Sequence, residues 1–130
     1  MLTNYLKRYR FSMLITAAIV VLSLAPMPEM EMLENVSLAD KWAHMVMYGV
    51  LSLAIWLEYL HSHKQIQPVR ITLLAVVMPI MLGGLLEVLQ AYATSCRSGE
   101  WLDFVADAVG VAIASLMGLA WSHFISITRQ

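Results

Sequence analysis

The feature that most constrains this sequence is a series of four apolar segments, each about as long as a membrane-crossing helix. They cover residues 11–28, 38–60, 69–92 and 101–125. A helix needs about 20 apolar residues to cross the ~30 Å hydrocarbon core of a bilayer. Charged residues make up only 13% of the chain, about half of their share in soluble domains. We therefore predict an all-α fold, an integral membrane four-helix bundle that forms one domain over residues 1–130.

The first segment has an alternative interpretation as a signal peptide, because a basic stretch precedes it. Signal peptides end in a cleavage site that contains small residues. Here the small residues at positions 23–25 are followed at once by Pro26, and Pro28 comes soon after. Since this is a poor cleavage site, we expect an uncleaved spanning helix.

Proline and glycine within the segments bear on helix geometry. Pro79 lies inside the third segment, and we expect it to kink that helix because it cannot donate a backbone hydrogen bond. Small residues let membrane helices approach closely. We therefore expect close packing between helices at Gly83, Gly84, Gly110 and Gly118.

The positively charged residues are divided unequally between the two sides of the predicted bundle. One side has Lys7, Arg8, Arg10, Lys64, Arg70 and Arg129, and the other has Lys41 and Arg97. Cytoplasmic loops of membrane proteins are enriched in Lys and Arg. We therefore predict that both termini are cytoplasmic, and that the first and third loops lie on the outer face.

Charge and cysteine content restrict the partners. The formal net charge is -1 and no basic stripe is present, so we expect the lipid bilayer and no nucleic acid as a partner. Cys96 is the single cysteine, which excludes a disulfide within one chain. An intermolecular disulfide and a homodimer are compatible with the sequence, but no feature of it fixes the stoichiometry.

Polar residues occur in pairs, one helical turn apart, near the predicted outer ends of three segments. The pairs are Asp40 with His44, Glu87 with Gln90, and Asp103 with Asp107. Residues three or four positions apart share one face of a helix. An ionised side chain in a spanning segment is costly unless it is paired or hydrated. We therefore predict that these side chains converge in one cluster open to the outer aqueous phase, with Arg97 of the third loop within reach.

Two hypotheses explain such a cluster. In the structural one, polar side chains hold the helices together, with Arg97 neutralising Glu87 and Asp107, and Lys41 neutralising Asp40. In the functional one, the cluster binds a polar headgroup at the outer leaflet. The predicted binding residues are then Asp40, His44, Glu87, Gln90, Arg97, Asp103 and Asp107.

The chemistry of the cluster has more than one interpretation. His44, Glu87 and Asp107 are the candidate catalytic residues, because they offer a general base or two to three hard metal ligands. Arg97 suits a phosphate or a carboxylate. The spacing does not choose between these roles. We predict no metal site, and the cofactor and enzymatic activity stay undetermined.

Three segments, in this order, resemble the VanZ-like family of small bacterial membrane proteins. They match the family's Asp-Lys-x-x-His, Gly-x-x-x-Glu-x-x-Gln and Arg-x5-Asp-x3-(Asn or Asp)-x2-Gly patterns. The matching segments are Asp40 to His44, Gly84 to Gln90, and Arg97 to Gly110. The sequence departs from the family at Ser95-Cys96, where members often have Pro-Gly, and at Asp107, where many have Asn.

The resemblance implies a bacterial inner-membrane protein associated with low-level resistance to the glycopeptide teicoplanin, without an established reaction. The first functional hypothesis is an envelope protein that binds a lipid-linked or anionic envelope group, or a glycopeptide-related ligand. The second is a membrane-embedded hydrolase or transferase acting on such a lipid. The third is a structural or ion-conducting bundle. The helices contain no ionisable residue between the levels of Glu87 and Glu58, which counts against ion conduction.

Overall fold

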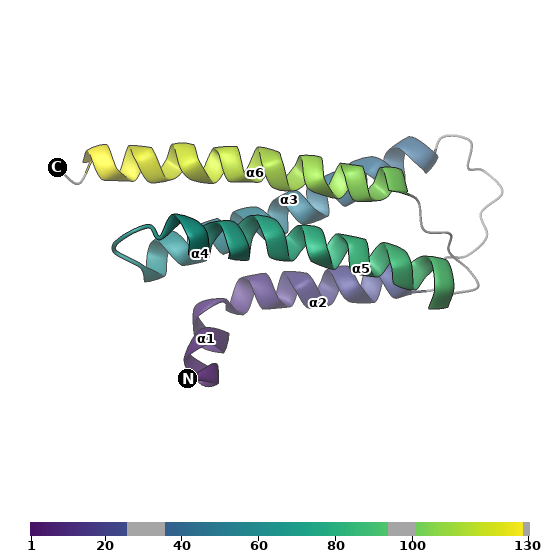
Figure 1. Cartoon of the computed structure of the whole chain (residues 1–130), viewed down its shortest axis with the longest axis horizontal. Coiled ribbons are helices and arrows are strands. Elements are labelled where there is room, and N and C mark those ends of the chain that lie inside the picture. The colour runs from purple at the N-terminus through teal and green to yellow at the C-terminus, as the bar shows by residue number, and fades with distance from the viewer. Residues whose placement is uncertain (26–35, 94–100, 129–130) are drawn as a thin grey trace.

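The computed structural model describes residues 1–25, 36–93 and 101–128, and within these ranges it contains helices and no strands. The helices, labelled in Figure 1, are α1 Leu2–Arg8, α2 Arg10–Leu24, α3 Val36–Ser62, α4 Pro68–Thr72, η2 Leu73–Val77, α5 Met78–Ala93 and α6 Trp101–Thr128. Helices α4, η2 and α5 follow one another without a break and form one rod from Pro68 to Ala93.

Three of these helical rods are long and apolar enough to cross a membrane. They are Ala39–Ser62, Pro68–Ala93 and Trp101–Thr128, with 24, 26 and 28 residues. The predicted all-α membrane fold is confirmed to that extent, and the predicted ends of these three helices lie within three residues of the observed ends. Helix α2 has 15 residues and is therefore about 22 Å long. It ends at Leu24, whereas the predicted segment continues to Pro28, which lies outside the described residues.

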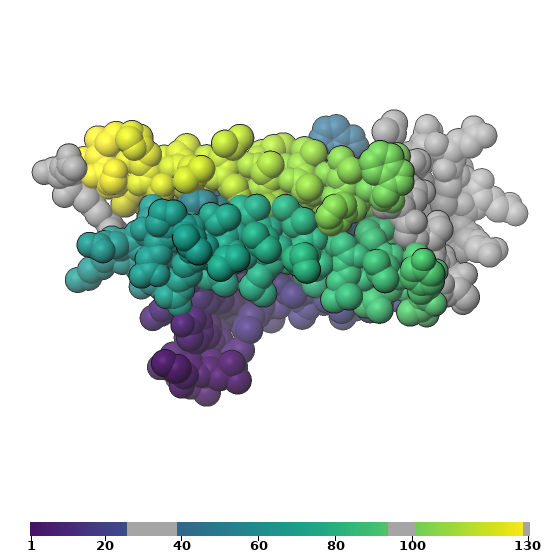
Figure 2. Space-filling model, in the orientation of Figure 1, coloured from purple at the N-terminus to yellow at the C-terminus, as the bar shows by residue number. Residues whose placement is uncertain are grey.

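Helices α2, α3, α5 and α6 run side by side (Figure 1). The beginning of α2, the turn between α3 and α4, and the end of α6 lie at one end of the bundle. We call this end the α1 end, because α1 is attached there. Helix α1 was not predicted from the sequence. It projects sideways from the bundle (Figures 1 and 2), and the backbone changes direction at Tyr9 between α1 and α2.

The most extensive helix contact is between α3 and α6. Gly110 makes it possible, because a methyl group there would overlap the carbonyl oxygen of Met45. A methyl group on Gly49 of α3 would likewise lie 3.2 Å from the carbonyl oxygen of Gly110. Gly118 lies against the indole of Trp56. The predicted close packing at Gly110 and Gly118 is confirmed, and it brings α3 and α6 close enough for their polar faces to meet.

Pro79 acts on the helix in the turn that precedes it. It has no backbone N–H to donate to the carbonyl of Ala75, four residues earlier. The chain there adopts the wider π-helical turn of η2, in which the N–H of Met78 bonds to the carbonyl of Leu73. The buried hydroxyl of Ser52 donates to the carbonyl oxygen of Ala75 at 2.6 Å. A kink was predicted at Pro79; the structure has a π-helical turn just before it, and a side chain of α3 supplies the hydrogen bond that Pro79 cannot make.

Helix α2 is held by polar contacts at both of its ends. At its beginning, Glu58 of α3 accepts hydrogen bonds from the backbone N–H groups of Phe11 and Ser12, at 2.8 and 3.2 Å, and from the hydroxyl of Ser12. These N–H groups have no acceptor within their own helix. At the far end, the amide of Gln90 donates to the carbonyl oxygen of Ser23 at 2.8 Å. The position of α2 along the bundle is thus fixed by α3 and α5.

We predict that Ser52→Ala destabilises the folded protein by about 1 kcal/mol, because the buried carbonyl of Ala75 loses its donor. Thermal unfolding in detergent measures the loss. Ser122→Ala is the matched control, since the Ser122 hydroxyl is exposed and bonds only within its own helix, to the carbonyl of Leu119. Equal stabilities of the two variants would contradict the role given to Ser52.

Candidate functional site

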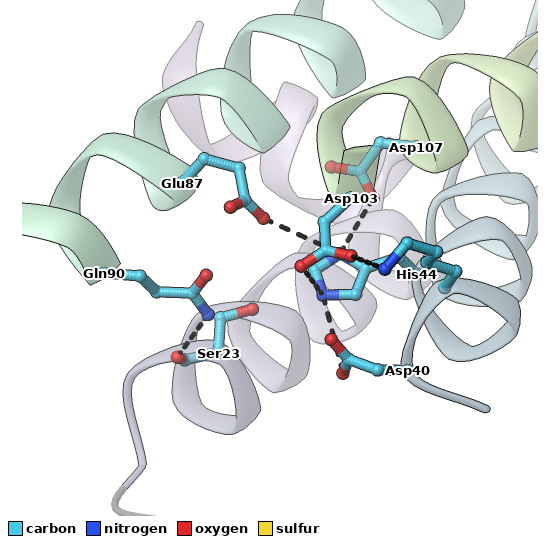
Figure 3. A network of polar contacts seen from close by, with 8 residues as sticks. Ser23, Asp40, His44, Glu87, Gln90, Asp103 and Asp107 are labelled. Carbon is cyan, nitrogen blue, oxygen red and sulfur yellow. Dashed lines mark hydrogen bonds and ion pairs between the residues drawn. The ribbon is translucent and has the colours of Figure 1, made fainter. Parts of the chain in front are cut away.

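Polar side chains from three helices meet around one imidazole, that of His44 (Figure 3). Helix α3 supplies Asp40 and His44, α5 supplies Glu87, and α6 supplies Asp103 and Asp107. Because side chains four residues apart lie on the same face of a helix, each of α3 and α6 contributes two groups to the same point. We call these five residues the His44 cluster. The predicted convergence is observed for all five.

Carboxylates lie on both sides of the imidazole. Nδ1 of His44 is 3.0 Å from Oδ1 of Asp107, a hydrogen bond between α3 and α6. The same nitrogen is 4.0 Å from Oε1 of Glu87. On the other side, Nε2 is 3.9 Å from Oδ1 of Asp40 and 4.0 Å from Oδ2 of Asp103. The short contact with Asp107 orients the ring.

The His44 cluster is buried on the Asp107 side and open on the Asp40 side. Asp107 is 0% exposed and His44 is 4% exposed, whereas the side chain of Asp40 is 40% exposed. Next to Asp40, the Nζ atom of Lys41 is 3.7 Å from Oδ1 of Asp103. The structural hypothesis paired Lys41 with Asp40, and the contact with Asp103 was not predicted. The cluster is therefore a buried polar site with the partly exposed side chains of Asp40 and Lys41 at its edge.

Asp107 has one oxygen for which the described residues provide no hydrogen-bond partner, Oδ2. This atom lies against Gly83 of α5, where an added methyl group would be only 2.5 Å away. Gly83 is four residues before Glu87 and lies on the same helix face. The absence of a side chain at Gly83 is thus what makes room for the carboxylate of Asp107 between α5 and α6.

The other predicted site residues have different positions. Gln90 is buried, and its amide bonds to Ser23 of α2, so it attaches α2 to the cluster side of the bundle (Figure 3). Arg97 lies outside the described residues, and its role stays a prediction. The contribution of Ser23 was missed, and Gly83 was expected to pack closely but not to make room for a site residue. For Gly83 a signal existed, namely a small residue one turn before Glu87.

Two groups of three residues in the His44 cluster have ligand atoms near enough to one another to hold a metal ion. Single ligand atoms of His44, Glu87 and Asp107 lie within 4.8 Å of one another, and so do those of Asp40, His44 and Asp103. Imidazole and carboxylate groups bind zinc and harder divalent cations. The sequence-based prediction that there is no metal site stays a prediction.

We predict that Gly83→Ala destabilises the protein by about 1–3 kcal/mol, because the added methyl group displaces the buried carboxylate of Asp107. Gly84→Ala is the matched control. A methyl group there meets the ring edge of Phe104 at 3.3 Å, and a side-chain ring can shift more easily than a buried ion pair.

A double-mutant cycle with Asp107→Ala isolates the effect in unfolding experiments. The cost of Gly83→Ala should shrink once the carboxylate is gone, so that the two changes are not additive. Additive costs would show that Gly83 acts through another contact.

Comparisons with protein-family models, with curated proteins and with solved structures found no match to this chain. The resemblance to the VanZ-like family therefore rests on the three sequence segments alone.

Proposed function

We propose that this chain is a four-span protein of the bacterial inner membrane whose His44 cluster binds the polar headgroup of an envelope lipid at the outer leaflet. The observation that carries the proposal is a nearly fully buried imidazole with four carboxylates from three helices within 4.0 Å. Groups of this kind are costly inside a membrane, and they commonly mark a functional site.

The attachment of α2 at both ends supports the fourth span. Its first turn is bonded to Glu58, and its last turn is bonded to Gln90. Along α3, Glu58 and His44 are 14 residues apart, which corresponds to roughly 21 Å. Helix α2 therefore covers the same depth of the membrane as the longer helices between these two polar levels.

Charge supports the orientation. Among the described residues, the α1 end has one acidic residue, Glu58, and five Lys and Arg residues. These five are Lys7, Arg8, Arg10, Lys64 and Arg70. Positive residues are retained on the cytoplasmic side. In this orientation both termini are cytoplasmic, and the His44 cluster opens toward the outer aqueous phase.

The chemistry of the cluster indicates the kind of headgroup. Its carboxylates accept hydrogen bonds and its edge has a lysine, Lys41, with Arg97 expected nearby. Carboxylates suit the hydroxyl or ammonium groups of a ligand, and lysine and arginine suit its phosphate. A lipid-linked sugar phosphate contains both kinds of group. By the family resemblance, such binding would be associated with low-level teicoplanin resistance.

Single changes in the His44 cluster and at Arg97 test the proposal. We expect His44→Ala, Glu87→Gln, Asp107→Asn and Arg97→Ala to increase the teicoplanin sensitivity of cells that depend on this protein, and to reduce the envelope lipid that copurifies with it. Mass spectrometry of lipid extracts measures the second effect. Thermal unfolding in detergent identifies the variants that remain folded, and only these are scored.

Glu58→Gln is the matched control, because Glu58 is the membrane carboxylate at the opposite end and bonds to α2. We expect it to lower stability without changing teicoplanin sensitivity or lipid content. If sensitivity follows stability in every variant, Glu58→Gln included, the His44 cluster only holds the helices together.

A second candidate function, a hydrolase or transferase acting on the same lipid, is favoured by one contact. Asp107 lies 3.0 Å from Nδ1 of His44, so the ring is oriented with Nε2 toward the partly exposed edge at Asp40. A carboxylate that orients an imidazole in this way supports general-base catalysis.

If this second function is correct, purified protein releases the headgroup from envelope lipid, and Asp107→Asn slows the release by about 10²–10⁴-fold. Quantifying the released headgroup phosphate over time is the measurement. Tight lipid binding without release would leave binding as the function of the site.

A further inference from the structure

A second feature of the molecule is a groove that begins at the α1 end, opposite the His44 cluster, and extends into the middle of the bundle. This groove, of about 530 Å³, runs between α2, α3 and the rod formed by η2 and α5. Its deep walls are apolar, with Leu51, Ile55, Leu74, Met78 and Leu82 among the lining residues. This volume is within the range of small-molecule binding sites, and the groove begins beside α1.

The mouth of the groove is polar and basic. Tyr5 and Tyr9 line it, and Arg70 donates a hydrogen bond to the hydroxyl of Tyr5 at 2.8 Å. The guanidinium of Arg70 also lies over the Tyr5 ring, 5.7 Å from its centroid. A guanidinium group of Arg8 is 3.3 Å from Nε2 of His63. The His63 ring in turn stacks on the ring of Tyr59. These contacts hold Arg8 at the same end of the bundle.

The mouth also contains a hydrogen-bond donor without an acceptor. The hydroxyl of Tyr9 is buried and has no hydrogen-bond partner among the described residues. Burial raises the pKa of this phenol above its usual value, although the charges of Arg70 and Arg8 act to lower it. The phenol is therefore neutral at physiological pH and can donate a hydrogen bond.

The acidic residue at this end does not neutralise the mouth. Glu58 accepts three hydrogen bonds from the first turn of α2. Glu58 forms no ion pair with a basic side chain among the described residues. Five Lys and Arg residues outnumber this single carboxylate at the α1 end, so the net positive charge there can attract an anion. An apolar groove that begins at a basic, hydrogen-bonding mouth matches a molecule with an apolar chain and an anionic head.

We propose that the groove holds one acyl chain of an anionic glycerophospholipid, with the phosphate at Arg70 and Arg8 and with Tyr9 as a donor to the phosphate or the ester. Such a lipid belongs to the leaflet at the α1 end, and this site is independent of the function of the His44 cluster. The short helix α1, which carries Leu2, Leu6 and Lys7, projects sideways at the α1 end (Figure 1). In the proposed orientation this is where the lipid headgroups of that leaflet lie.

Native mass spectrometry of the full-length chain, released from detergent micelles, tests the proposal. The chain is titrated with dioleoyl phosphatidylglycerol or with dioleoyl phosphatidylcholine, which have the same acyl chains. We expect the first phosphatidylglycerol to bind more tightly, by about fivefold for each arginine that contacts the headgroup. Arg70→Gln should reduce this preference about fivefold, whereas Arg70→Lys should retain most of it.

Two matched controls separate the mouth from the groove. Lys64→Gln removes an exposed charge at the same end and should leave the preference unchanged. Ala17→Phe fills the groove, which Ala17 lines, and should abolish the tightly bound first lipid. Ala18→Phe adds the same ring at the next residue, which is also exposed but is not part of the groove lining, and should bind lipid as the unmodified chain does.

Three results would overturn the proposal. The first is equal binding of the two lipids by the unmodified chain. The second is retention of the preference in Ala17→Phe, which would reduce the effect to surface attraction. The third is a dimer that forms without lipid and is lost in Ala17→Phe but not in Ala18→Phe, because the occupant would then be a second copy of this chain.

Discussion

The constraint on which the rest of the structure depends is that a polar group within a bilayer needs a partner inside the protein. The His44 cluster meets this constraint by drawing on three helices, with the bond from His44 to Asp107 as its shortest contact. The bond requires α3 and α6 to lie close together, and Gly110 allows that approach. Gly83 then makes room for Asp107 against α5. The site and the helix packing are therefore one arrangement.

The same constraint explains features that lie far from the cluster. Pro79 leaves a backbone carbonyl without its donor, and Ser52 of α3 supplies one. The first turn of α2 has N–H groups without acceptors, and Glu58 accepts from them. Each of these hydrogen bonds joins two helices. Polar groups that would be costly one at a time thus fix how the helices lie relative to one another.

The sequence predicted what depends on composition and on helical spacing. The lengths of the apolar segments predicted three spanning helices to within three residues of their observed ends. The four-residue spacing placed Asp40 with His44, and Asp103 with Asp107, on common helix faces. It could not predict which carboxylate lies nearest the imidazole, because that depends on how two helices are rotated. Lys41 was assigned to Asp40, and its contact with Asp103 was not predicted. Helix α1 is too short to give a periodic signal, and the groove is formed by residues from separate helices.

The two ends of the bundle differ in a way that keeps their chemistry apart. The cluster end has four carboxylates around His44, and the α1 end has arginines around a groove. About 21 Å of helix separates His44 from Glu58. The buried polar groups between these two levels include the hydroxyls of Tyr48 and Ser52 and the indole of Trp56. None of these three ionises readily near neutral pH. None of these three side chains can therefore carry a proton or an ion from one end of the bundle to the other. This separation favours the two proposed binding sites over a path for ions through the protein.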